Sequence, residues 1–143
     1  MIILDTDHIS ALQHRDAPKA FALQARLETF SPDEIATTVI TVEEQTRGWL
    51  GLIRRHTDVH RQVAYYERLV RLFDFFAEWQ ILPFDQRAAD EFKRLRQQGI
   101  RIGGTMDLKI ASIVLVGGGT LLSGNNRDFQ QIPGIQVEDW LQS

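Results

Sequence analysis

Four acidic residues stand just beyond segments that have the character of strands or of buried helix starts. Asp5 follows the apolar run 2–4, and Glu44 lies one helical turn past a second run rich in β-branched residues. Asp107 lies in the first turn of an apolar helix, and Asp128 follows a fourth expected strand by five residues. Ligands of open α/β sheets bind outside the carboxyl ends of the strands. We therefore expect these four carboxylates to converge at one edge of a sheet.

Carboxylates gathered in this way predict a divalent metal ion. Each one resists ionising beside the others, and a bound cation removes that penalty. Oxygen ligands without cysteine or a histidine pair suit Mg²⁺ or Mn²⁺ rather than zinc. Such an ion activates water and neutralises charge on a phosphoryl oxygen, and two ions roughly 3.5–4 Å apart clamp the attacking and leaving oxygens. The predicted chemistry is phosphodiester hydrolysis by a metal-bound water.

Each acid also has a purely structural explanation. Asp5 can be the cap of a following helix, and Glu44 can be solvated on an exposed helix face. Asp107 can serve the dipole of its helix, and Asp128 can form a turn. One shared site accounts for all four acids together, so we favour it over four unrelated explanations.

Alternating strands and helices must position these residues. The expected strands cover residues 2–4, 35–40, 80–84, 120–123 and 136–138. Three helices are expected to begin at caps, which are Asp16 (with Pro18 in the first turn), Thr41 and Thr105. A further helix carries the apolar residues 88, 92 and 95 and stops at Gly99. This order predicts an α/β fold with a mainly parallel sheet of four to five strands flanked by helices.

The clearest helix covers residues 59–77. Its apolar residues recur in alternating steps of four and three, as on one face of a helix. The stretch 42–55 before it is also helical in character, although Gly48 and Gly51 interrupt it. We expect the two segments to pair as a helical hairpin.

Composition limits the class of protein. The 143 residues fit a single domain over 1–143, and we find no repeat or linker. The absence of cysteine suits a reducing cytoplasm, and the N-terminal apolar run is too short for a signal peptide or a membrane span. The net charge of −3 argues against a broad basic face for nucleic acid, but 13 of the 16 basic residues are arginine, the better bidentate partner for phosphate.

Four sequence motifs, taken in order, resemble the PIN domains of VapC-type toxins. They are the stretches 4–8 (LDTDH), 41–48 (TVEEQTRG), 102–111 (IGGTMDLKIA) and 123–129 (SGNNRDF). The second motif has a Ser or Thr three residues before its acid and a Gly four residues after it, which selects Glu44 over Glu43. The resemblance runs from residue 1 to about residue 140 and implies a PIN-like fold with Mg²⁺- or Mn²⁺-dependent endoribonuclease activity. It also implies an RNA substrate, a homodimer and a cognate antitoxin that covers the acidic pocket.

The resemblance also suggests individual roles. Asp5, Glu44 and Asp107 would hold the first metal ion, and Asp128 would join them or position water. Asp7, Ser123 and Asn125 would orient these ligands or touch phosphate, although a place near a helix N-terminus explains Asp7 equally well. Weaker candidates for contacts to the RNA backbone are Arg47, Arg54 and Arg55. Two departures from the family pattern are Gln45, in place of an apolar residue, and Gly124, in place of a longer side chain.

Other interpretations remain open. The Asp5-Thr6-Asp7 stretch also matches the opening of haloacid dehalogenase-like phosphatases, but no acidic pair follows the last strands as that class requires. A receiver or interaction module would need Asp acceptor chemistry at a central strand and a Lys after a late strand, and neither is evident in this sequence. A non-catalytic PIN-fold binding protein is a further alternative. None of the histidines has a spacing typical of a metal site; His56 and His60 are four apart on either side of an expected helix start and are expected to be exposed.

Overall fold

Five parallel strands form the centre of the computed structural model, which describes residues 1–14 and 16–142. Their order across the sheet is β3-β2-β1-β4-β5. The strands are β1 (Ile2–Leu4), β2 (Ile35–Thr38), β3 (Ile81–Leu82), β4 (Thr120–Leu122) and β5 (Gln136–Glu138). The predicted parallel sheet is therefore confirmed. Strands β2 and β3 are shorter than predicted, because residues 39–40 already belong to a helix and only two residues pair at the edge of the sheet.

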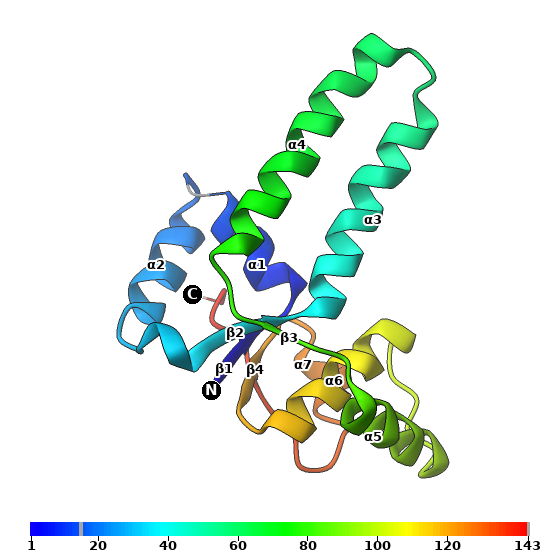
Figure 1. Cartoon of the computed structure of the whole chain (residues 1–143). Coiled ribbons are helices and arrows are strands. Elements are labelled where there is room, and N and C mark those ends of the chain that lie inside the picture. The colour runs from blue at the N-terminus through cyan, green and yellow to red at the C-terminus, as the bar shows by residue number, and fades with distance from the viewer. Residues whose placement is uncertain (15, 143) are drawn as a thin grey trace.

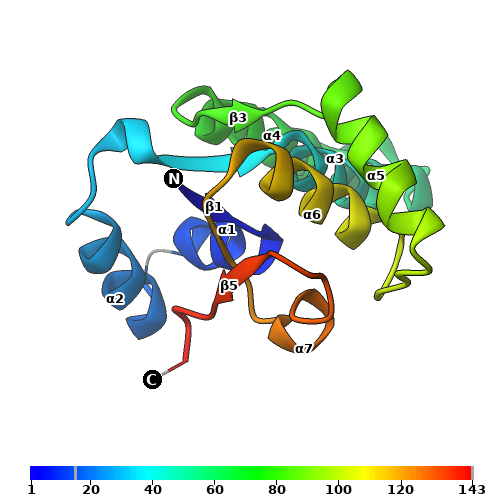
Figure 2. The same ribbon diagram turned by 90° about the horizontal axis from the view of Figure 1, so that it is seen from below.

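Helices cover both faces of this sheet. They are α1 (Thr6–Gln13), α2 (Pro18–Leu27), α3 (Val39–Arg55), α4 (Val59–Ala77), α5 (Gln86–Gln97), α6 (Thr105–Gly117) and α7 (Asn126–Phe129), with a 3₁₀ turn η1 (Pro32–Glu34). Seen from below, α1 and α2 lie on one side of the strands and α5 and α6 on the other (Figure 2). The sequence therefore folds into three layers, with the sheet between two sets of helices.

Strand β1 shows why its residues are apolar throughout. Ile3 faces the cluster formed with α5 and α6, whereas Ile2 and Leu4 face the cluster formed with α1, α2 and the base of α4. Neighbouring side chains of a strand point to opposite faces, so a central parallel strand buries both. Leu4 pairs with Thr37 of β2 and with Leu122 of β4. The residues that follow these strands consequently meet at the same edge.

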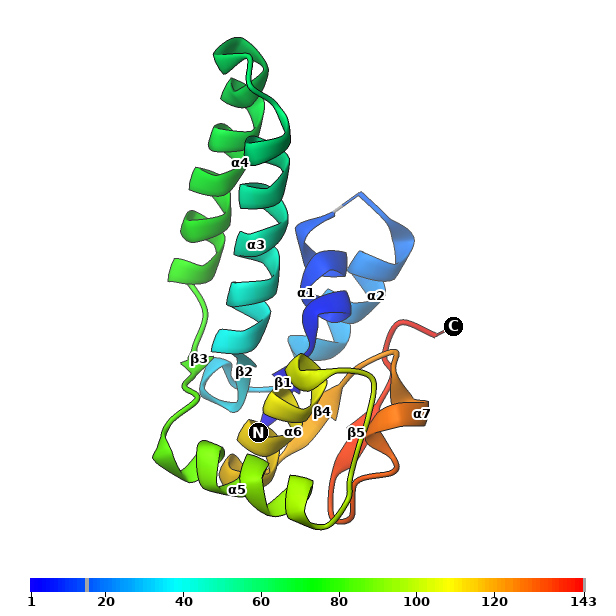
Figure 3. The ribbon, with the colours of Figure 1, turned by 90° about the vertical axis from the view of Figure 1, so that its right-hand side faces the viewer.

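The helical hairpin is confirmed as α3 and α4, which project together beyond the sheet (Figures 1 and 3). Gln62 and Tyr65 of α4 contact the end of α3: the Gln62 amide donates to two backbone carbonyls there, and the Tyr65 ring lies against Trp49. None of the helices in the described part of the chain is long and apolar enough to cross a membrane.

Three predicted helix caps are wrong by one to three residues. The cap of α3 is Thr38, whose hydroxyl accepts from the Thr41 amide at 3.3 Å, because Val39 turns directly from strand into helix. Helix α2 is capped by Ala17 rather than Asp16, since Pro18 occupies the first helical position that it favours. Gly104, not Thr105, is the cap of α6.

Candidate active site

Asp5 lies where the ends of β1 and β4 meet. It is the N-cap of α1: its Oδ1 accepts from the Thr6 amide at 2.7 Å, and its Oδ2 accepts from the Ser123 hydroxyl at 2.7 Å. The residue is only 8% exposed. Burial raises the pKa of Asp5 to about 6; the two hydrogen bonds oppose this rise, and the charges of Asp7 and Asp107 add to it. The side chain that caps α1 therefore also lies among the other acids.

Glu44 reaches the same place from α3. Its Oε2 accepts from the Thr6 hydroxyl at 2.9 Å, and Thr6 also contacts the Thr41 hydroxyl at 3.2 Å. Burial raises the pKa of Glu44, and the charge of Asp107 raises it further. Glu43 instead pairs with Arg47 at 2.9 Å on the surface. The structure thus directs Glu44, not Glu43, toward the acids, as the motif register predicts.

Asp107 and Asp128 share one hydrogen-bond donor. The Asn125 side-chain amide donates to Asp107 Oδ2 at 3.2 Å and to Asp128 Oδ2 at 3.3 Å. Burial raises the pKa of Asp107, and the neighbouring charge of Asp128 also raises it. Gly103 lies directly against both acids: a Cβ atom there would be 2.5 Å from Asp107 Oδ2 and 3.2 Å from Asp128 Oδ2. The pair is therefore closely confined.

Asp7 differs electrostatically from these acids. Its Oδ1 accepts from the backbone amide and from the ring Nδ1 of His8, each at 2.8 Å, and its Oδ2 accepts from the Gly124 amide at 2.6 Å. Burial works to raise the pKa of Asp7, but the bonds from His8 and Gly124 outweigh it and lower the pKa overall. Asp7 is therefore an ionised, fully engaged carboxylate beside Asp5 and Asp107.

The acids come from four separate helix starts, as the sheet topology requires. Asp5 precedes α1, Glu44 lies in the second turn of α3, Asp107 in the first turn of α6 and Asp128 in α7. Within residues 1–14 and 16–142, none of the four forms an ion pair with a basic side chain. Asp5, Glu44 and Asp107 combine raised pKa values with the lack of a cationic partner in this described part of the chain, and their oxygen donors suit Mg²⁺ or Mn²⁺. In the same described part of the chain, no three acidic or histidine side chains are already close enough together to hold one ion.

Comparison with known proteins assigns the family. The PIN domain family model matches residues 2–135. This chain belongs to the PIN domain family. A curated relative, the tRNA(fMet)-specific endonuclease VapC of Salmonella typhimurium, is 33% identical over 83 residues, which is 56% of this chain and 63% of the relative. The match thus spans less than two thirds of that relative's length.

Solved structures share the same PIN fold. The structure of VapBC-1 from nontypeable Haemophilus influenzae matches with a TM-score of 0.75 and 23% identity, covering 99% of this chain and 100% of the other. FitAcB from Neisseria gonorrhoeae matches with a TM-score of 0.72 and 22% identity over 100% of both chains. The predicted PIN-like fold is confirmed, and the folds of the phosphatase and receiver alternatives are excluded.

The three predicted arginines lie at different distances from the acids. Arg47 is one turn beyond Glu44 but bonds to Glu43 on the surface. Arg54 and Arg55 lie in the last turn of α3, so about 15 Å of helix separates Arg54 from Glu44. Their positive charges suit that helix end in any case. A role for these arginines in binding RNA stays a prediction.

Two residues that sequence reasoning passed over belong to the site. Thr6 bridges Asp5 and Glu44 through its amide and hydroxyl, and its place between two motif acids was the only available signal. His8 is fully buried and holds Asp7. His60 is exposed, as predicted, with its Nδ1 3.7 Å from Asp58 Oδ1, whereas His56 is half-buried at the end of α3.

Gln45 has a structural explanation. Its side chain exchanges two hydrogen bonds with Gln13 of α1, at 2.8 and 3.0 Å, and also donates to the Ser10 hydroxyl at 3.2 Å. The polar pair thus joins α1, which follows Asp5, to α3, which carries Glu44. An apolar residue at position 45 would leave the Gln13 amide without this partner.

We expect Gln45→Leu to destabilise the protein by about 1 kcal/mol, because the half-buried Gln13 amide loses its hydrogen bonds. Urea denaturation of the single variants and of the double variant Gln13→Leu/Gln45→Leu measures this effect. The double variant should recover part of the loss, since two apolar side chains then pack together. A double-variant loss equal to the sum of the two single losses would show that the pair does not couple.

Proposed function

We propose that this PIN domain is a Mg²⁺- or Mn²⁺-dependent endoribonuclease, the toxin of a toxin–antitoxin pair, with one domain over residues 1–143. The observation that carries the proposal is the cluster of Asp5, Glu44 and Asp107 at the carboxyl edge of the sheet. All three have raised pKa values that burial and neighbouring negative charges explain. A site that keeps such carboxylates without a basic partner is suited to a divalent cation.

In this proposal Asp5, Glu44 and Asp107 hold the ion, and Asp128 joins them or positions water. A bound ion would supply activation of water and neutralisation of charge on the phosphoryl group. The surrounding residues orient the acids. Ser123 donates to Asp5, and Asn125 donates to both Asp107 and Asp128.

RNA is the substrate class we infer. The curated relative is named as a tRNA-specific endonuclease. The clustered carboxylates would hold a divalent ion, and a water activated by such an ion would hydrolyse a phosphodiester. The cysteine-free composition suits action in the cytoplasm.

The decisive experiment incubates purified protein with total cellular RNA, with Mg²⁺, with Mn²⁺ or with EDTA. The Asp107→Asn variant tests the site, and Asp74→Asn, an exposed carboxylate on α4, is the matched control. We expect cleavage by the wild type and by Asp74→Asn, and none in EDTA or by Asp107→Asn. Equal cleavage by Asp107→Asn would contradict the site, and no cleavage with any metal would favour a non-catalytic binding protein.

A protein antitoxin is the partner we propose. The structural relatives include a toxin–antitoxin complex from Klebsiella pneumoniae. An apolar groove of about 420 Å³ lies between α1, α2 and the base of α4, and would give a partner segment a place to pack. The residues that line it are Leu12, Ala20, Phe21, Gln24, Phe75 and Trp79.

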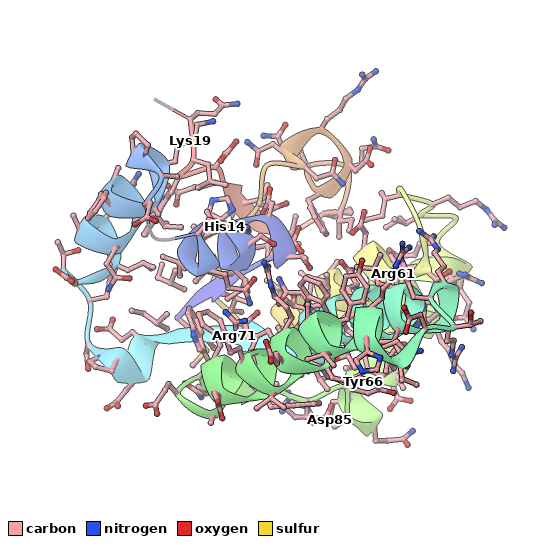
Figure 4. All side chains as sticks on the ribbon, turned by 90° about the horizontal axis from the view of Figure 1, so that it is seen from above. His14, Lys19, Arg61, Tyr66, Arg71 and Asp85 are labelled. Carbon is pink, nitrogen blue, oxygen red and sulfur yellow. The ribbon has the colours of Figure 1, made fainter. Side chains whose placement is uncertain are left out.

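A homodimer is the assembly we propose, through the outer stripe of α4. Val59, Val63, Tyr66, Val70 and Phe73 follow one another at helical spacing, and each is more than half exposed. Figure 4 shows Tyr66 on the side of α4 away from α1, and Arg71 on the side toward it. A continuous apolar stripe of this kind marks an interaction surface.

The double variant Val63→Glu/Val70→Glu should therefore be monomeric. These side chains make no contribution to the buried core, so the midpoint of thermal unfolding of the monomer should change little. Light scattering after size exclusion gives the mass, with Ala64→Glu, on the polar side of the same helix, as control. A double variant that remains dimeric would place the interface elsewhere.

A further inference from the structure

His8 is a buried histidine whose two ring nitrogens both have partners. Its Nδ1 lies 2.8 Å from Asp7 Oδ1, and its Nε2 accepts from the Trp140 amide at 3.1 Å, with Asp139 Oδ1 farther away at 3.6 Å. A backbone amide only donates, so Nε2 is the acceptor and the ring proton sits on Nδ1. The imidazole therefore donates to Asp7 with one nitrogen and accepts from Trp140 with the other.

Asp7 connects His8 to the loop that follows β4. Its second oxygen accepts from the Gly124 amide at 2.6 Å, and a Cβ on Gly124 would lie 2.6 Å from that oxygen. Gly124 stands between Ser123, which donates to Asp5, and Asn125, which donates to Asp107 and Asp128. The loop thus carries two side chains that hold Asp5, Asp107 and Asp128, three of the four acids, and Asp7 fixes its middle residue. The absence of a longer side chain at position 124 also has its reason here.

The other side of His8 is anchored by the C-terminal segment. The Trp140 ring stacks on Phe30 with centroids 5.8 Å apart, and the Arg26 guanidinium lies 3.9 Å above it. Glu138, two residues earlier, accepts from the Ser123 amide at 2.9 Å through its backbone carbonyl. The segment therefore holds the same loop directly through Glu138 and indirectly through His8.

We propose that His8 is a positioning residue of the site: it orients Asp7, and Asp7 holds the Ser123–Asn125 loop against Asp5, Asp107 and Asp128. This inference rests on the proposed function. The acids repel one another. The donors on the loop, Ser123 and Asn125, counter this repulsion only when they are held at fixed positions. His8 supplies that fixation from outside the set of groups that would touch metal or RNA.

Two substitutions test the two ring nitrogens of His8 separately, because each keeps one contact of the ring and removes the other. In His8→Asn, the side-chain amide nitrogen takes the place of Nδ1 and still donates to Asp7, but nothing accepts from Trp140. In His8→Gln, the longer side chain puts its oxygen near the place of Nε2 and accepts from Trp140, while the donor to Asp7 is lost. Each variant loses one hydrogen bond of the buried ring, and the bond lost in His8→Gln is the less buried of the two, so a purely structural role predicts no larger loss in that variant.

The readout is Mn²⁺ affinity, measured by calorimetry without RNA, together with RNA cleavage and the unfolding temperature. We expect similar decreases of the unfolding temperature in both variants. His8→Asn should keep Mn²⁺ affinity and cleavage within about threefold of the wild type, whereas His8→Gln should lose about 10- to 100-fold, as residues that orient metal ligands typically do. Equal losses in the two variants, or losses that follow the unfolding temperature, would overturn the positioning role.

The Gly124 amide proton gives a second measurement that needs neither metal nor activity. In NMR spectra its shift should remain near the wild-type value in His8→Asn and move clearly in His8→Gln, because Asp7 turns when it loses the ring donor and keeps only its two backbone donors. An unchanged shift in both variants would overturn the link through Asp7. A wild type that binds no Mn²⁺ and cuts no RNA would overturn the proposed function and this role with it, whereas an active wild type isolates the test to His8.

Discussion

Asp5→Asn should abolish RNA cleavage and at the same time stabilise the metal-free protein at pH 7. The carboxylate is buried among other negative charges, and its pKa is about 6 in the folded chain against 3.8 for the unperturbed group. The folded state therefore holds the Asp5 proton more tightly than the unfolded state does. Ionisation at neutral pH opposes folding, and asparagine removes the charge while keeping the size.

The sign of the pH dependence follows from linkage. Because the pKa of Asp5 is raised on folding, the protonated carboxyl contributes to folding stability. This contribution is fully present below about pH 4 and is lost as the pH rises through about 6. A difference of roughly two pKa units corresponds to about 3 kcal/mol, which is the upper end of the expected gain. Asparagine keeps the cap of α1 by accepting from Thr6, and the Ser123 hydroxyl can rotate to accept from the amide.

Urea denaturation in EDTA at pH 7 and pH 4 measures this gain. Asp5→Asn should exceed the wild type at pH 7, and the difference should shrink toward zero at pH 4. Mn²⁺ should stabilise the wild type and not the variant, since only the wild type would bind the ion. Asp74→Asn is the control and should match the wild type throughout. A variant less stable than the wild type at pH 7 would refute the electrostatic account of Asp5.

Gly103→Ala should strongly weaken the binding of the metal ion at the site. A Cβ at this position would come within 2.5 Å of Asp107 Oδ2, so that carboxylate must move away from Asn125 and Asp128. The backbone angle φ of Gly103 is +29°, which adds strain of about 1–3 kcal/mol for alanine. We expect Mn²⁺ affinity to fall by about 10-fold or more, with a parallel loss of cleavage.

Gly104→Ala is the matched control one residue along. A Cβ there would meet nothing within 4 Å, and the φ of −161° is ordinary extended backbone. Its cost is confined to a poorer helix cap, about 1 kcal/mol. Calorimetric titration with Mn²⁺, beside thermal unfolding, separates the two effects. If the two alanine variants bound Mn²⁺ equally well, the contact between Gly103 and Asp107 would not control the site.

The four acids could be predicted because their signals are local. Each follows a strand or begins a helix, and parallel strands deliver such residues to one edge. The details that failed depend on tertiary context. Val39 and Ile40 are β-branched and were assigned to a strand, yet the sheet ends at Thr38 and Ile40 packs into the core beneath α6. Local preference for a strand yielded to burial in a helix.

His8 shows why the supporting residues could not be predicted. Its two partners are the adjacent Asp7 and the amide of Trp140, which is 132 residues away in the chain. Every residue except proline has a backbone amide, so the residue type at position 140 does not indicate this hydrogen bond. Gln45 is a similar case, because its partner Gln13 lies 32 residues earlier and nothing in either position marks the pairing. Contacts of this kind become visible only when the sheet has brought the segments together.

The hydrogen bond between Trp140 and His8 can form only late in the synthesis of the chain. A ribosome makes all four carboxylates by residue 128, but Glu138 and Trp140, which tie down the loop and the histidine, are translated later. Strand β1 likewise gains its neighbour β4 only after more than a hundred further residues. Domains generally fold as units while chains emerge from the ribosome. A nascent chain that ends before Glu138 therefore carries every acid of the site without the contacts from Glu138 and Trp140 that hold the Ser123–Asn125 loop and His8 in place.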